Sequence, residues 1–201
     1  MIDIKKNLAA IDSQIQQRVT KKNSDKQRAT LVAVSKKQPL AAIREAVDAG
    51  QRHFGESYVR EAVEKIAAMD NDSLIWHFIG AIQSNKTRQI AEHFHWVHTI
   101  DRLKIAQRLS EQRPDSLPDL NVCLQINIDN DPAKAGVVPE QARQLAMELV
   151  QLPKLNLRGM MTITAAQKTK RESKESFSAM RELFDSLRDE LGLQHFDTLS
   201  M

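Results

Sequence analysis

A lysine at the end of the most apolar short run in the chain suggests nucleophilic chemistry. The run 31–35 predicts a fully buried strand, and Lys36 follows it directly. Partial desolvation of an amine at the rim of such a strand disfavours the ammonium form and leaves a nucleophile near neutral pH. Such an amine forms a Schiff base with an aldehyde or another carbonyl compound. The alternative is a lysine that merely ends a strand and extends its charged head into water.

The rest of the chain predicts the scaffold that positions this lysine. After a helix expected over about 4–19, strand-like and helix-like segments alternate. The expected strands are 31–35, 53–54, 74–79, 96–100, 122–126, 159–163 and 198–201, and the expected helices are 40–49, 58–68, 85–93, 102–112, 139–151 and 174–191. This alternation indicates right-handed βαβ units and a parallel sheet. Seven strands, without a glycine-rich dinucleotide motif after the first, favour an α/β fold of the (β/α)8 TIM-barrel type, one strand short of closure.

In such a barrel the functional residues gather at the carboxyl ends of the strands. In this chain small and polar residues gather at those ends, with one amine among them: Lys36, Gly55, Glu56, Ser57, Gly80, 99–101, Asn127, 162–164 and Ser200. This set predicts a pocket rim for a polar, planar, anionic ligand. Strand-to-helix junctions are polar in any barrel because they hold turns and caps. That general rule does not explain why a lysine ends the most apolar strand.

Composition narrows the classes of function. The 201 residues carry a net charge of +3, from 29 basic and 26 acidic residues that are well mixed, so a nucleic-acid-binding stripe is not expected. The densest basic run, 168–174, includes Glu172 and is interpreted as a solvated loop and helix start. Cys123 is the only cysteine and is expected to be a core residue. No signal peptide or membrane-spanning run is evident, so we expect a cytoplasmic protein without membrane contact.

The histidines do not predict a metal site. His93, His95 and His98 have metal-like spacing, but the first ends a helix and the other two lie on opposite faces of a strand. His77 is expected to be a hydrogen-bonded residue of the third strand. No serine or cysteine nucleophile with a histidine partner is recognisable.

Four segments together resemble a known family. They are Ala33-Val34-Ser35-Lys36, the run 54–59 (FGESYV), the run 76–86 (WHFIGAIQSNK) and the run 197–201 (DTLSM). The chain resembles, from its first helix to its last residue, the pyridoxal phosphate homeostasis protein family, whose fold is similar to the barrel domain of alanine racemase. The resemblance implies pyridoxal 5′-phosphate as the cofactor, held as an aldimine on Lys36. It also implies that the family's second, loop lysine is Lys134 and that Ser200 opens the phosphate-binding turn. We place Ser57 and Asn127 with these residues on the cofactor rim.

The sequence departs from the family pattern at three places. Ser57 stands where an asparagine is usual, and Ala81 stands where a proline or histidine is usual. The chain also stops at Met201, where the family continues with the rest of the phosphate turn, a helix and an eighth strand. We therefore expect residues 1–201 to form a single barrel domain that is incomplete at its C-terminus and holds the cofactor poorly.

The function implied by the resemblance is a non-catalytic carrier in intracellular pyridoxal phosphate homeostasis, a monomer that passes the cofactor to apo-enzymes. A racemase needs acid and base groups on both faces of the aldimine, and Tyr58 is the only tyrosine, with no evident partner. The alternatives are a racemase-like or Schiff-base lyase enzyme acting on amino acids or keto acids, and an interaction protein without a ligand.

Overall fold

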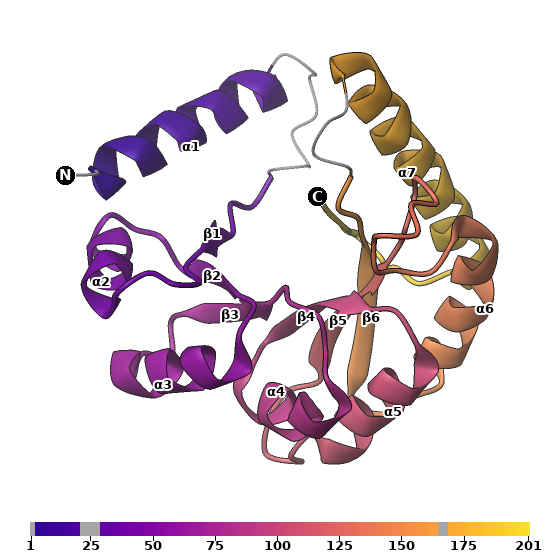
Figure 1. The fold of residues 1–201 in the computed structure, drawn as a ribbon, viewed down its shortest axis with the longest axis horizontal. Helices are drawn as coiled ribbons and strands as arrows, with labels where there is room; N and C mark the ends of the chain where they lie inside the picture. The colour runs from indigo at the N-terminus through magenta and orange to yellow at the C-terminus, as the bar shows by residue number, and fades with distance from the viewer. Residues whose placement is uncertain (1–2, 21–28, 165–168) are drawn as a thin grey trace. The chain divides into compact units, whose positions relative to one another are not determined.

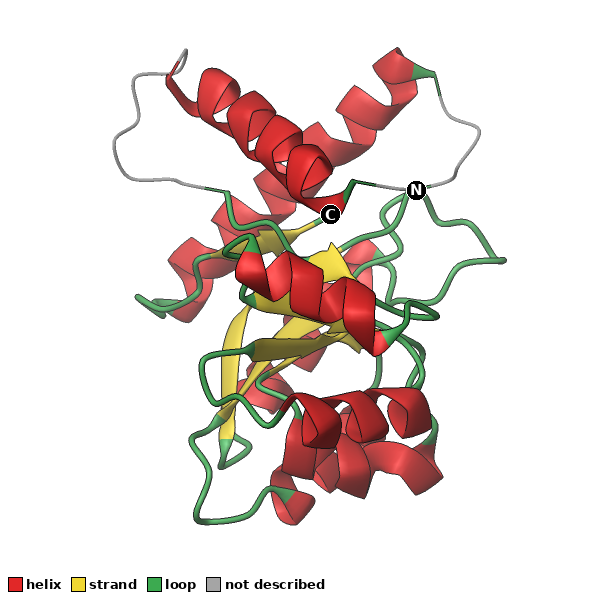
Figure 2. Cartoon of the chain, turned by 90° about the vertical axis from the view of Figure 1, so that its left-hand side faces the viewer, coloured by secondary structure: helices red, strands yellow, loops and turns green. Residues whose placement is uncertain are grey.

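The computed structural model describes residues 3–20, 29–164 and 169–201. The chain divides into two compact units, Met1–His77 and Phe78–Met201. Within the described residues there are seven strands, and they follow one another in chain order, β1 to β7. The predicted alternation of strands with helices is confirmed (Figures 1 and 2). That the chain forms one barrel domain stays a prediction.

The first unit carries the candidate lysine. Its elements are α1 (Ile4–Thr20), β1 (Ala33–Val34), α2 (Leu40–Asp48), β2 (His53–Glu56), α3 (Val59–Met69) and most of β3 (Ile75–Phe78). Strand β1 pairs with β2 in parallel, with Ala33 opposite Phe54 and Val34 opposite Gly55. Helix α3 buries Val59, Ala62 and, unusually for a charged side chain, Lys65.

The prediction of a fully buried strand over 31–35 is wrong. Strand β1 has only two residues, and the side chain of Val34 is 51% exposed, whereas Ser35 is buried. Successive side chains of a strand point to opposite faces, so Ser35 lies on one face while Val34 and Lys36 belong to the other. The apolar run was interpreted as burial on both faces, but Ser35 is the one residue of 31–35 that is buried. Lys36 itself is exposed, so strand burial does not desolvate its amine.

The second unit is a regular α/β arrangement. Its elements are η1 (Ser84–Lys86), α4 (Thr87–His93), β4 (Trp96–Ile100), α5 (Leu103–Gln112), β5 (Leu120–Gln125), α6 (Pro139–Val150), β6 (Leu155–Met161), α7 (Lys170–Leu191) and β7 (Thr198–Ser200). Strands β4 to β7 pair in parallel, each with the next. Helices α5 and α6 lie on the outer side of β5 and β6 in Figure 1. The strands supply much of the core of this unit, because most residues of β4, β5 and β6 are buried.

Strands β6 and β7 approach so closely that one position requires glycine. A Cβ atom at Gly159 would lie 1.9 Å from the carbonyl oxygen of Thr198. Gly159 pairs on its other side with Cys123, which is fully buried. Burial raises the pKa of the Cys123 thiol to about 12, so this side chain is an inert part of the core, as predicted.

Helix α7 begins about one turn before the predicted start at 174. Thr169 accepts a hydrogen bond from the backbone N–H of Glu172, and the Glu172 carboxylate accepts one from the backbone N–H of Thr169. This capping box satisfies two N–H groups that the start of a helix leaves unpaired, which fixes the helix start. Residues 170–174 of the basic run are helical, which confirms the helix start expected there, and Lys168 lies outside the described residues. Among the described helices, none has both the length and the apolar character that crossing a membrane requires.

Candidate functional site

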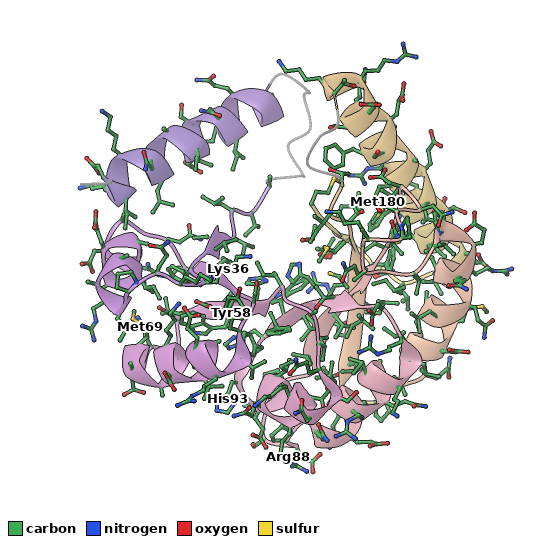
Figure 3. All side chains as sticks on the ribbon, in the orientation of Figure 1. Lys36, Tyr58, Met69, Arg88, His93 and Met180 are labelled. Carbon is green, nitrogen blue, oxygen red and sulfur yellow. The ribbon has the colours of Figure 1, made fainter. Side chains whose placement is uncertain are left out.

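Lys36 lies in a tight turn directly after β1. The backbone N–H of Ser35 donates to the carbonyl of Gly55 at 2.9 Å, and the N–H of Gln38 donates to the carbonyl of Ser35 at 3.0 Å. Lys37, the third residue of this turn, has a φ of 61°, as the third position of a type II turn requires. The Lys36 amine is therefore exposed while its backbone is held (Figure 3).

A buried network of charged side chains lies behind this turn. The Ser35 hydroxyl donates to Oε1 of Glu56 at 2.7 Å. The Lys65 ammonium donates to the Ser35 carbonyl at 2.6 Å, to the same Glu56 oxygen at 2.8 Å and to Oε1 of Glu61 at 2.6 Å. That Glu61 oxygen also accepts the backbone N–H of Lys37 at 2.6 Å. We call these five residues the lysine-turn network.

The charges of the lysine-turn network depend on one another. Glu56 is fully buried and Lys65 is 6% exposed. The hydrogen bond from Lys65 is the largest of the effects that lower the pKa of Glu61. Oε2 of Glu56 is buried and has no hydrogen-bond partner among the described residues. Among the described residues, Lys65 is the cation that contacts both carboxylates, and its loss would leave a buried charge uncompensated.

Ser57 and Tyr58 follow β2, the strand beside Lys36. Ser57 is half-buried, and Tyr58 is 49% exposed at the start of α3. The Lys37 ammonium lies 5.8 Å from the centre of the Tyr58 ring, within reach of a cation–π interaction. The two neighbouring lysines of the turn thus have different surroundings, since Lys37 has an aromatic partner.

Lys134 lies in the second unit, in a loop after β5 that hydrogen bonds hold together. The Asn127 amide donates to the carbonyl of Asp131 at 2.8 Å and accepts the backbone N–H of Asp131 at 3.0 Å. The N–H of Lys134 donates to the Asp131 carbonyl at 2.9 Å, and Val137 forms a parallel bridge with Ile126. The amide of Asn127 is therefore engaged by its own loop, and its contact with a cofactor stays a prediction.

Gly136 allows this loop to close, and the sequence interpretation missed it. Its φ is +118°, and a Cβ atom here would lie 2.8 Å from the backbone nitrogen of Asn127. Any other residue would be strained and would collide with the end of β5. The Lys134-Ala135-Gly136 sequence was the signal that could have identified it.

Ser200, at the end of β7, contacts a buried histidine of β4. Nδ1 of His98 lies 2.8 Å from the Ser200 hydroxyl. Burial lowers the pKa of His98 to about 4, so the ring is neutral at pH 7. Strands β4 and β7 are not neighbours in the sheet, so this contact requires the sheet of the second unit to curl. The sequence interpretation considered His98 only as a metal ligand and missed this role.

Other polar residues at the strand ends have structural partners. The hydroxyls of Thr99 and Thr162 donate to the carbonyls of Gly80 and Ile126, at 2.6 and 2.9 Å. Nε2 of His77 lies 3.0 Å from Nδ1 of His53, which confirms the expectation of a hydrogen-bonded strand residue. No group of three potential metal ligands occurs among the described histidine, cysteine and acidic residues.

The predicted site residues fall into two groups. Lys36 and Ser57 belong to the first unit, whereas Asn127, Lys134 and Ser200 belong to the second. Each residue follows or ends a strand, as the sequence predicted. In the first unit the added finding is the lysine-turn network, and in the second it is the contact between His98 and Ser200.

Comparison with known proteins identifies the family. The alanine racemase N-terminal domain family matches residues 7–201. A pyridoxal phosphate homeostasis protein of Pseudomonas aeruginosa is 50% identical over 201 residues, which cover 100% of this chain and 85% of that protein. The chain belongs to the pyridoxal phosphate homeostasis protein family. The relative in Escherichia coli is 46% identical over 204 residues, covering 100% of this chain and 86% of that protein.

A solved relative gives the fold of this family. PipY of Synechococcus elongatus, in its structure with pyridoxal phosphate bound, matches with a TM-score of 0.79 and 36% identity, over 93% of this chain and 88% of that one. Its structure without pyridoxal phosphate matches with a TM-score of 0.81 and 38% identity, over the same shares of the two chains. With the family match, these similarities confirm the predicted α/β fold, a partial TIM barrel of the alanine racemase type.

Proposed function

We propose that this protein binds pyridoxal 5′-phosphate through a Schiff base on Lys36 and acts as a carrier of that cofactor without catalysing a reaction on it. The observation that carries the proposal is the geometry of the Lys36 turn, which presents an exposed amine from a backbone held by hydrogen bonds on both sides. The pyridoxal phosphate bound to PipY supports the choice of ligand.

The chemistry of the attachment is a reversible condensation. The neutral amine of Lys36 adds to the aldehyde carbon, a C=N bond forms and water leaves, so no oxidant or reductant is needed. Attack requires the free-base amine. The Glu56 carboxylate on the opposite face of the strand is already engaged by Lys65 and Ser35, so we assign it no proton transfer.

Ser200 is proposed as a phosphate-binding residue. A neutral His98 that donates from Nδ1 to the Ser200 oxygen would leave the Ser200 hydroxyl proton available for a phosphate oxygen. Ser57, half-buried after β2, is a second hydroxyl that we assign to the cofactor. Both assignments are part of the proposal.

Lys134 is proposed as a second amine that takes the aldehyde during transfer to an apo-enzyme. Its loop is well defined by hydrogen bonds, and its side chain is half-exposed. In a transimination the second amine replaces the first on the same carbon. We expect Lys134→Ala to slow cofactor transfer to an apo-enzyme while leaving binding intact. An unchanged transfer rate would remove this role.

The proposal is tested by absorbance. Protein mixed with pyridoxal phosphate should show the near-ultraviolet to violet band of a Schiff base, and Lys36→Ala should abolish it. Lys37→Ala is the matched control, since it removes the neighbouring lysine of the same turn and should retain the band. A band that survives in Lys36→Ala and disappears in Lys37→Ala would overturn the assignment.

The carrier role is distinguished from an enzyme by isotope exchange. A racemase-like activity would introduce solvent deuterium at Cα of L-alanine in the presence of bound cofactor. We expect no exchange above that of pyridoxal phosphate alone, because acid and base groups are needed on both faces of the imine. Exchange that depends on Lys36 or Tyr58 would establish the enzyme instead.

A further inference from the structure

We infer that Lys65 and Glu61 of α3 are positioning residues for Lys36, which fix the backbone on both sides of the Schiff-base lysine without contacting the ligand. The inference rests on the proposed function, since it concerns how the proposed nucleophile is held. It gives a role to the buried charge of Lys65, for which strand β1, helix α3 and the attachment chemistry offer no other explanation.

The two contacts hold the two peptide groups that flank Lys36. The Lys65 ammonium holds the carbonyl of Ser35, which belongs to the peptide group before Lys36. The Glu61 carboxylate holds the N–H of Lys37, which belongs to the peptide group after Lys36. The φ and ψ angles of Lys36 lie between these two groups, so fixing both groups fixes the direction in which the side chain leaves the backbone.

The two positioning residues are linked to each other. Glu61 and Lys65 lie four residues apart on α3, which places them on the same face of the helix, and their ion pair measures 2.6 Å. Their side chains are 31% and 8% exposed, so water competes only weakly with these contacts. The helix thus presents one donor and one acceptor to the turn as a single unit.

Glu56 holds Lys65 in place. Its fully buried carboxylate receives both the Lys65 ammonium and the Ser35 hydroxyl, at 2.8 and 2.7 Å. Lys65 therefore has three acceptors around one ammonium, which matches its three donors. An amine satisfied in this way has little freedom to move, and neither does the Ser35 carbonyl that it holds.

This arrangement also bears on the choice between the two adjacent lysines. The N–H of Lys37 is held by Glu61 and its ammonium lies over the Tyr58 ring, whereas the Lys36 amine is exposed with its backbone fixed. Loosening the turn should therefore lower the reactivity of Lys36 and raise the share of adduct formed on Lys37. A purely structural role for the network would change stability without changing this share.

The test compares two carboxylates of the same helix. Glu61→Ala removes the contacts with Lys65 and with the turn, whereas the control Glu64→Ala removes only an exposed pair with Arg60. Each folded variant is reacted with limiting pyridoxal phosphate at pH 7.5, and the rate of appearance of the Schiff-base band is followed. Borohydride then fixes the adducts, and peptide mapping gives the ratio of Lys36 to Lys37 adduct.

We expect Glu61→Ala to slow the reaction of Lys36 by roughly tenfold and to shift adduct towards Lys37, because an ill-placed nucleophile reacts more slowly. Glu64→Ala should react as the unsubstituted protein does. If Glu61→Ala proves unstable, Ser35→Ala, which removes only the hydroxyl that faces Glu56, should shift the adduct ratio in the same direction. An unchanged rate and ratio in the folded variant would overturn the positioning role while leaving the proposed function intact. Absence of any adduct on Lys36 in the unsubstituted protein would overturn both.

Discussion

The loop that carries Lys36 and the loop that carries Lys134 both follow parallel strands, but they are held in different ways. Buried charges hold the Lys36 turn, with Lys65 between Glu56 and Glu61. Neutral hydrogen bonds hold the Lys134 loop, mainly from the Asn127 amide, and a glycine allows it to close on the end of β5.

The difference matters because removing one contact has different consequences for the two loops. Removing one member of a buried charged cluster leaves its partners uncompensated, so the cluster is lost as a whole. Removing one neutral hydrogen bond usually costs much less, and the rest of the loop remains. A fixed turn suits an amine that must hold a ligand, whereas a loop with separable contacts suits the proposed role of Lys134 in transfer.

The largest effect on stability is expected in the lysine-turn network. Lys65→Met should lower the free energy of unfolding by about 3–5 kcal/mol, because Glu56 and Glu61 lose the cation between them. Arg60→Met is the matched control on the same helix, with a side chain 90% exposed, and should change stability by no more than about 1 kcal/mol. Urea denaturation measures both variants. A loss as small in Lys65→Met as in Arg60→Met would show that the cluster does not hold the first unit together.

In the Lys134 loop, which is held by neutral hydrogen bonds, the position most sensitive to substitution is Gly136. Gly136→Ala should cost about 1–3 kcal/mol because it combines a φ of +118° with a Cβ contact of 2.8 Å to the backbone of Asn127. Gly192→Ala is the control, since its φ is also positive, at +62°, but a Cβ there meets nothing within 4 Å. Thermal melting compares a glycine that is both strained and crowded with one whose Cβ position is open. Equal shifts in melting temperature would mean that the loop moves aside at no cost.

A smaller effect is expected from the Asn127 side chain. Asn127→Ala removes the contacts with Asp131 and should cost about 1–2 kcal/mol, while Val137 keeps its bridge to Ile126. The loss of stability should be local to this loop, so Lys36 should still form the imine at saturating ligand while transfer through Lys134 slows. Rapid amide hydrogen exchange confined to residues 128–136 would support this. Loss of the Lys36 Schiff-base band at saturating ligand in this variant would contradict a local effect.

The smallest effect is the pH dependence that Glu61 confers. Its pKa is lowered from the ordinary 4.5, first by the hydrogen bond from Lys65, so folding is favoured by the ionised form. The stabilisation is fully present above pH 4.5 and is lost as the pH falls through the lowered pKa. The difference in stability between the unsubstituted protein and Glu61→Gln should therefore shrink on acidification below pH 4.5. A difference that grows under acid would reverse the sign of the proposed interaction.

Features that depend on local sequence patterns were predicted, whereas features that depend on contacts between separate elements were not. The alternation of strands and helices, the burial of Cys123 and the placement of Lys36, Asn127 and Ser200 after or at the ends of strands follow from local patterns and were predicted. The exposure of Val34 was not, because an apolar run does not show which face of a strand is covered. The roles of Lys65 and His98 were missed, since each depends on contacts with other elements: Ser35 and Glu56 for Lys65, and Ser200 for His98.

Chemical trapping decides whether Lys36 is the residue that holds the cofactor. The unsubstituted protein is equilibrated with pyridoxal 5′-phosphate, reduced with borohydride, digested and mapped by mass spectrometry. We expect a pyridoxyl group on Lys36 and little on Lys37. Lys36→Ala should lose that adduct while keeping its stability, since the side chain is exposed. A pyridoxyl group found only on lysines other than Lys36 would show that Lys36 does not hold the cofactor.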